Sequence, residues 1–216
     1  ESWSVRRVLE RRTAGNPSIR HYAVCDENPA QVSRLRELGG CHDSFHVYAG
    51  DVNERIHAML REAPIGPKTA CFCLIDQRTF ECHWATVEAV ARYKREGFKI
   101  ELFYFLAQGW LDRAQSTSGP ERLRAWWGNS DYRQFLERRS YDRANTLCRR
   151  FIHEFGYEYS IPFAIHEKGE DSRTMYYMIH ASDHPRAARL MSEAYGEVGS
   201  NRPTGGVQLD FFPGIQ

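Results

Sequence analysis

Acidic residues stand directly after three apolar runs of the chain. Asp26 and Glu27 follow the first run, Asp51 follows the second, and Asp76 follows the third. If these runs are parallel strands, their carboxyl ends meet at one edge of a sheet, where ligands of open α/β sheets bind. One carboxylate there suits the two ribose hydroxyls of a nucleoside, and another suits the exocyclic amine of adenine. The pattern predicts a nucleoside cofactor bound by Asp26 or Glu27 and by Asp51. Asp76 is then placed to contact the molecule that accepts a group from this cofactor.

Each of these carboxylates has a second interpretation. An Asp at the end of a strand is also a common turn or helix-capping residue, because its side chain bonds to nearby backbone amides. Three carboxylates in equivalent positions favour one shared site over three separate turns.

Strand-like and helical runs alternate along the first half of the chain. Short amphipathic helices are expected over 3–12 and from Pro29 onward. The strand-like runs, recognised by their apolar and β-branched content, are 19–25, 45–49, 68–75 and 99–106. The last two are continuous apolar runs, as in parallel strands that are buried on both faces. The alternation predicts a mostly parallel, doubly wound α/β sheet.

The second half of the chain has a different pattern. Residues 109–154 contain no strand-like run and predict a helical insert. Two strand-like runs, 158–167 and 174–181, flank a polar turn and predict an antiparallel β-hairpin. An amphipathic helix over 184–195 follows, and 199–216 is predicted to be a linker and tail.

Composition limits the class of protein. A chain of 216 residues can form one domain with a substantial core. The 29 Lys and Arg residues nearly balance the 28 Asp and Glu residues, so net charge does not indicate a strongly basic nucleic-acid binder. No apolar run approaches the roughly 18 residues that a membrane span needs. No secretory leader opens the chain, and we expect a cytoplasmic protein without a membrane segment.

The 6 cysteines raise the question of a metal site. Cys71, Cys73, Cys82 and His83 combine thiolate and imidazole, which suit zinc. However, Cys71 and Cys73 lie on one face of a strand-like run, where Cys packs as a small apolar side chain. No second close-spaced ligand pair follows them. We therefore expect reduced thiols and no metal site.

The predicted insert is the most basic and aromatic part of the chain. A nucleic-acid surface that uses phosphate contacts and base stacking has this composition. Arg138 and Arg139 are the residues we select for such a surface. The alternative is a solvated helical cap whose aromatic residues pack in the core. The interleaved arginines are Arg122, Arg124, Arg133, Arg138, Arg139, Arg143, Arg149 and Arg150.

Several segments give the chain a resemblance to a known family. They are FCLIDQRTFECHW at 72–84, ATVEAVARY directly after it, Trp127-Gly128, and TMYYMIHASDHPRAARLM at 174–191. Together they are similar to the three-Cys-motif partner family, whose members resemble class I S-adenosylmethionine (SAM)-dependent methyltransferases. The resemblance implies a Rossmann-like sheet, mostly parallel with a terminal antiparallel hairpin. It implies one methyltransferase-like domain over 1–198, with the helical insert at 109–154 and the linker and tail at 199–216.

Two functions follow from this resemblance. The first is SAM-dependent methyl transfer to a nucleic-acid base or another polar nitrogen. In it, Asp76 orients the acceptor amine and Phe80 stacks on the acceptor. The second is a catalytically inactive methyltransferase-like module that binds a partner protein.

The resemblance also implies a first strand with a Gly-rich loop that is not found among these residues. We expect that strand upstream of Glu1, and its place in the sheet is between the strands that end at Asp26 and Asp76. An apolar run near the end of the chain, Val207–Phe212, is the less favoured occupant of that place.

Overall fold

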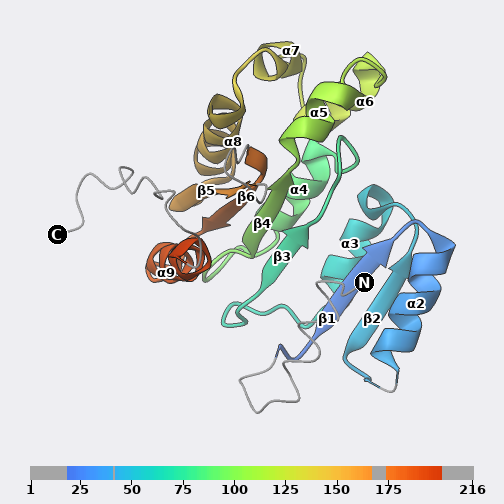
Figure 1. Cartoon of the computed structure of the whole chain (residues 1–216). Coiled ribbons are helices and arrows are strands. Elements are labelled where there is room, and N and C mark those ends of the chain that lie inside the picture. Colours follow the sequence, from blue (N-terminus) through green and yellow to red (C-terminus); the bar gives the residue numbers. More distant parts are fainter. Residues whose placement is uncertain (1–18, 41, 167–173, 201–216) are drawn as a thin grey trace.

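The computed structural model describes residues 19–40, 42–166 and 174–200 (Figure 1). The helix predicted at 3–12 and the run Val207–Phe212 lie outside these ranges. No helix within the ranges is both long and apolar enough to cross a membrane. The elements in chain order are β1 (Tyr22–Asp26), α2 (Pro29–Gly39), β2 (Phe45–Ala49), α3 (Val52–Glu62), β3 (Phe72–Ile75), α4 (Trp84–Ala91), β4 (Glu101–Leu106), α5 (Gln108–Ala114), α6 (Pro120–Trp127), α7 (Tyr132–Leu136), α8 (Ser140–Phe155), β5 (Tyr159–His166), β6 (Thr174–Ser182) and α9 (Ala187–Ser200).

The described strands form two sheets. β1 and β2 pair in parallel as a two-stranded sheet. The other strands are ordered β3-β4-β6-β5, with β3 and β4 parallel and β6 antiparallel to both of its neighbours. The α/β class and the hairpin formed by β5 and β6 are confirmed. No ladder joins β1 to β3 among the described residues, as expected if a further strand belongs between them, and a single Rossmann-like sheet stays a prediction.

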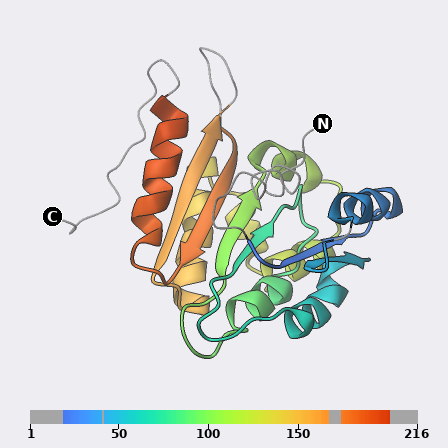
Figure 2. The same cartoon turned by 90° about the horizontal axis from the view of Figure 1, so that it is seen from below.

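Helices lie on both faces of the strands (Figures 1 and 2). α2 covers one face of β1 and β2, whereas α3 and α4 pack together on the opposite face. α8 lies on the α4 side, over β5 and β6, and α9 packs against β5 on the other side. The helical insert predicted at 109–154 corresponds to α5 through α8. Three of these helices, α5, α6 and α7, lie beyond the carboxyl end of β4 (Figure 1).

β3 is buried on one face only, which corrects the prediction of a strand covered on both faces. Phe72 and Leu74 point to the same face and are 50% and 40% exposed, whereas Ile75 on the other face is buried. In the neighbouring strand, Leu102 and Tyr104 are fully buried on the core face.

Arg150 joins three helices in the core. Its guanidinium lies 3.7 Å from the ring centroid of Trp84 in α4 and 4.1 Å from that of Trp127 in α6. It donates to the Glu154 carboxylate and, at 2.6 Å, to the Trp127 carbonyl. The Trp84 indole N–H donates to Glu154 at 3.0 Å. Gly128 ends α6 with a φ of +89°, and a Cβ there would lie 2.6 Å from the Trp84 ring, so glycine is required for this packing.

We predict that Arg150→Ala lowers the free energy of unfolding by about 3 kcal/mol, because it leaves Glu154 and the Trp127 carbonyl without their partner. Urea unfolding measures this change. Arg149, the adjacent exposed arginine, provides the control, and Arg149→Ala should change the stability by less than about 0.5 kcal/mol. Equal losses in the two variants would contradict the importance of the stacked guanidinium.

Candidate functional site

The carboxyl ends of β1 and β2 are adjacent. Gly50, directly after β2, donates its backbone N–H to the Asp26 carbonyl at 3.0 Å. The strand order changes direction at this point. α2 leads outward from β1 to β2 on one face of the sheet, and α3 leads back past β1 to β3 on the other face. In open α/β sheets this kind of switch point forms the crevice in which ligands bind. The candidate site is therefore the edge between the ends of β1 and β3.

Asp51 caps α3 and is tied to the loop after β3 through Asn53. The Asp51 Oδ1 accepts from the Asn53 backbone N–H at 2.8 Å and from its Nδ2 at 2.7 Å. The Asn53 Nδ2 also donates to the Glu81 carbonyl at 2.9 Å. The Asn53 Oδ1 accepts from the His83 backbone N–H at 2.8 Å and from the Thr86 hydroxyl at 2.7 Å. All four hydrogen-bonding positions of the carboxamide are filled, so it links the end of β2 rigidly to the loop at 76–83.

Asp26 takes part in a turn, as the second interpretation of the sequence proposes. Its Oδ1 accepts from the Asn28 backbone N–H at 2.8 Å, and Asn28 caps α2 through the Ala30 N–H at 2.9 Å. Glu27 is exposed, and its carboxylate has no partner among the described residues. Asp26 and Asp51 each use only Oδ1 in these contacts with described residues, so Oδ2 of each is available to a ligand.

Asp76 and Phe80 have different environments, although both are predicted from the sequence to contact the methyl acceptor. Asp76 is exposed, and its carboxylate pairs with no other described residue. The Phe80 ring is 0% exposed and packs edge to face on Trp126, with ring centroids 4.9 Å apart. A ring buried in this way offers no face to an acceptor, so the structure gives Phe80 a packing role in place of the predicted stacking role.

The loop that follows Asp76 is fixed by its own side chains. Glu81 accepts from the Thr79 backbone N–H at 2.7 Å and from the Thr79 hydroxyl at 2.8 Å. Arg122 of α6 donates to the Phe80 carbonyl at 3.4 Å and lies 3.9 Å from Glu81. The insert therefore contacts the loop at the candidate site.

Thiols near this edge remain protonated. The Cys25 Sγ donates to the Gly50 carbonyl at 3.3 Å, and burial, followed by the nearby Asp26 charge, raises the pKa of Cys25 to about 11. Burial likewise raises the pKa of Cys82 to about 12. A protonated thiol is a poor nucleophile and a poor metal ligand. In the ranges described above, no three Cys, His, Asp or Glu side chains come together in a group that could hold a metal ion.

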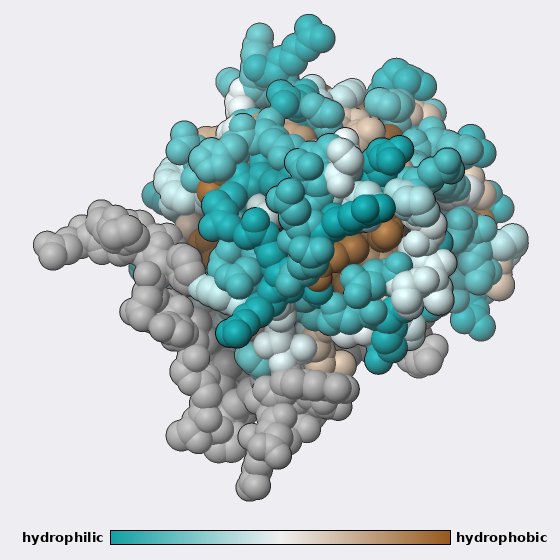
Figure 3. Space-filling view, turned by 90° about the horizontal axis from the view of Figure 1, so that it is seen from above, coloured by the Kyte–Doolittle hydropathy of each residue, from teal (hydrophilic) through white to brown (hydrophobic). Residues whose placement is uncertain are grey.

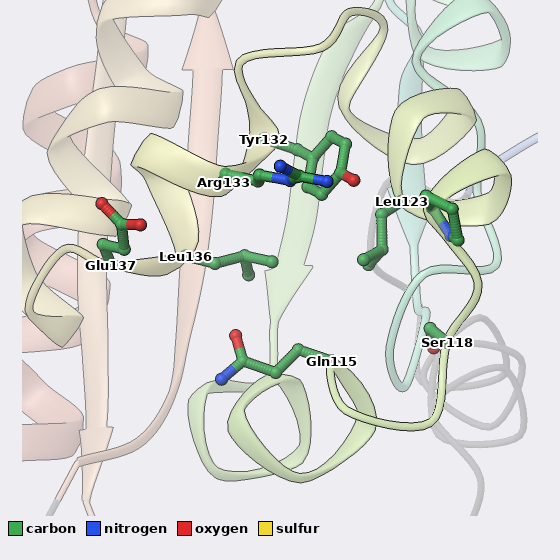
Figure 4. Close-up of a pocket in the computed structure, with 8 residues that line it drawn as sticks. Gln115, Ser118, Leu123, Tyr132, Arg133, Leu136 and Glu137 are labelled. Carbon is green, nitrogen blue, oxygen red and sulfur yellow. The ribbon is translucent and has the colours of Figure 1, made fainter.

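A cleft of about 470 Å³ lies elsewhere, between α5, α6 and α7. Figure 4 shows Leu123 and Leu136 facing each other across it, with Tyr132 and Arg133 on one side and Gln115 on the other. None of the carboxylates predicted from the sequence lines this cleft. It belongs to the insert and not to the strand ends.

The arginines of the insert divide into two groups. Arg143 and Arg150 are buried and bonded to protein groups, so they are not available to a nucleic acid. Arg138 and Arg139 are exposed, and neither has an ion-pair partner among the described residues. The side of the molecule on which α5 to α7 lie is mostly hydrophilic (Figure 3).

Comparison of the chain with protein-family models, with curated proteins and with solved structures found no match. The resemblance to the three-Cys-motif partner family therefore stays a prediction from the sequence.

Asn53 was not identified from the sequence, although its Asp-x-Asn spacing directly after a strand was visible. We predict that Asn53→Ala lowers the free energy of unfolding by about 2 to 3 kcal/mol, because it leaves the His83 N–H and the Glu81 carbonyl without a partner. Thermal or urea unfolding tests this. Asn145→Ala is the control, because the Asn145 side chain has no described partner and Ala is the better helix former. A loss no larger than that of the control would refute the linking role of Asn53.

Proposed function

We propose that the chain binds SAM at the edge between β1 and β3 and transfers its methyl group to a nucleic-acid base or another polar nitrogen. The order and direction of the strands support this proposal most directly. A parallel array that ends in a hairpin, with β6 antiparallel between β4 and β5, is the arrangement implied by the resemblance to class I methyltransferases. The reversal of chain direction between β1 and β3 supports the same edge as the ligand crevice.

The residues at this edge have the chemistry that a nucleoside cofactor needs. The Oδ2 atoms of Asp26 and Asp51, to which no described residue is hydrogen-bonded, can accept hydrogen bonds from ribose hydroxyls or from an adenine amine. SAM supplies an electrophilic methyl group when it is bound. Asp76, which is exposed and pairs with no described residue, accepts from the N–H of the acceptor amine and orients its lone pair. Phe80 is not part of this proposal, because its ring is buried.

We predict that Asp51→Asn and Asp76→Asn separate cofactor binding from methyl transfer. Asn caps a helix as well as Asp does, so Asp51→Asn should fold normally and weaken SAM binding by about 1 to 3 kcal/mol, measured by calorimetric titration. Asp76→Asn should abolish transfer of labelled methyl groups to oligonucleotides while SAM affinity stays within a few-fold. Asp43, exposed before β2 at the opposite edge, is the control. Unchanged SAM affinity in Asp51→Asn would remove that residue from the site.

We also predict that exchange of Arg138 and Arg139 for Glu weakens binding to single-stranded oligonucleotides and reduces its dependence on salt, because fewer counterions are released. Fluorescence anisotropy over a series of salt concentrations measures both quantities. The control exchanges Arg186 and Arg189, exposed residues next to and within α9, for Glu. If the unchanged protein does not bind oligonucleotides at low salt, a nucleic acid is not the acceptor.

The second candidate function is a module that binds a partner protein without catalysis. The exposure of Phe72 and Leu74 favours it, because apolar side chains on an incompletely covered sheet are suited to a protein contact. SAM binding to the unchanged chain distinguishes the two candidates.

A further inference from the structure

We propose that Trp110 of α5 stacks on the methyl acceptor, so that the acceptor is a planar base of a single-stranded nucleic acid and not an aliphatic amine. This inference rests on the proposed methyl transfer and narrows its substrate. It gives Trp110 the stacking role that the buried ring of Phe80 cannot have.

Trp110 is a tryptophan that the fold leaves at the surface. It is 55% exposed, whereas the other tryptophans of the described ranges, Trp84, Trp126 and Trp127, are 6%, 1% and 4% exposed. An indole has a large apolar surface whose burial stabilises a fold, and Trp110 does not gain this stabilisation. Exposed aromatic rings of this kind are the side chains on which single-stranded nucleic acids stack their bases.

Trp110 lies at the same edge of the sheet as Asp76. β3 and β4 are parallel neighbours, with Ile75 opposite Tyr104. Asp76 directly follows Ile75, and Trp110 is the third residue of α5, which lies beyond the carboxyl end of β4 (Figure 1). From the spacing of strands and the rise of a helix, the Cα atoms of Asp76 and Trp110 are on the order of 10 Å apart. A base stacked on the indole can therefore present its amine to Asp76.

The helix that carries Trp110 is anchored on its opposite side. Gln108 and Leu111 are buried, and Asp112 accepts from the buried Arg143 at 2.6 Å. Residues two positions apart on a helix point about 200° away from each other. Gln108 and Asp112 thus hold the side of α5 that faces away from Trp110, and the indole projects from the other side.

A cation lies against the indole. The Arg113 guanidinium is 4.9 Å from the ring centroid of Trp110, and it has no carboxylate partner among the described residues. The guanidinium covers one face of the ring, and the 55% exposure of the residue leaves the other face accessible to a planar ligand. An aromatic ring beside an arginine can bind a base and its phosphate together.

The charge of the helical insert favours a nucleic acid over an amine. Of the 29 Lys and Arg residues of the chain, 9 lie at 109–154, together with only 6 of the 28 Asp and Glu residues. The insert is therefore net positive, whereas the rest of the chain is net negative. This charge attracts the phosphates of a nucleic acid and repels the ammonium form of an aliphatic amine.

Three substitutions of Trp110 in the 216-residue chain test the inference. Trp110→Ala removes the ring, Trp110→Leu keeps apolar bulk without a ring, and Trp110→Phe keeps a ring. The probe is a single-stranded oligonucleotide that contains all four bases. Its KM in methyl transfer and its Kd by fluorescence anisotropy should rise at least about tenfold in the Ala and Leu variants, and stay within about threefold in the Phe variant. The affinity for SAM, measured by calorimetric titration, should not change in any of them.

Two controls separate stacking from other effects. An abasic oligonucleotide of the same length keeps the phosphates but has no base to stack, so it should bind equally well to the unchanged chain and to Trp110→Ala. Phe98→Ala is the matched protein control, because Phe98 is 51% exposed and precedes β4 at the opposite edge of the sheet. It should leave the KM for the oligonucleotide unchanged.

Two results would overturn the inference and leave the proposed function standing. One is methyl transfer to the oligonucleotide with the same KM in the unchanged chain and in Trp110→Ala. The other is a Leu variant that performs as well as the Phe variant, because apolar packing would then replace stacking. If the unchanged chain binds SAM but neither binds nor methylates the oligonucleotide, the acceptor is not a nucleic-acid base and the inference fails. If the unchanged chain does not bind SAM, the proposed function fails, and the inference fails with it.

Discussion

The carboxamide of Asn53 is the interaction on which the candidate site depends. The sheet of β1 and β2 shares no described ladder with the larger sheet, so backbone pairing does not fix their relation. Asn53 supplies that link at the carboxyl ends, through bonds to Asp51 on one side and to the Glu81 carbonyl on the other. Packing of α3 against α4 supplies a second link. A fully bonded amide resists rotation, because any new position leaves polar groups unsatisfied.

Two buried guanidinium groups hold the helices of the insert together, and one of them, Arg150, also joins the insert to α4. Arg150 joins α8 to α4 and α6 by stacking between Trp84 and Trp127. Arg143 joins α8 to α5 and α7, because it donates to Asp112 at 2.6 Å and to the Leu136 carbonyl. Arginine suits this role because its planar group stacks on rings and donates in several directions at once. Part of the basic character of the insert is therefore structural, and only the exposed arginines remain for a ligand.

Local patterns in the sequence predicted the features that depend on neighbouring residues. The order of strands and helices, the terminal hairpin and the capping position of Asp51 follow from apolar periodicity and turn chemistry, which act over a few residues. The roles of Phe80 and Arg150 depend on partners far along the chain. Trp126 buries the Phe80 ring, and Trp84 and Trp127 enclose Arg150. No local pattern contains that information.

The burial of β3 was mispredicted for a related reason. The continuous apolar run at 68–75 predicts a strand that is covered on both faces. The strand itself is present, as β3. Coverage, however, depends on what packs against Phe72 and Leu74, and these two side chains are 50% and 40% exposed. The strand thus has the composition of a central strand while it lies at the edge of its described sheet.

The proposed cofactor site is tested most directly by mapping backbone amide chemical shifts on addition of SAM to the 216-residue chain. The account predicts that the largest shifts occur at residues 26–28, 50–53 and 76–83, which come from three strand ends. The amides around Leu123 and Leu136 in the insert cleft should change little. Shifts concentrated at that cleft, or no shifts at any SAM concentration, would contradict the assignment of the cofactor to the edge between β1 and β3.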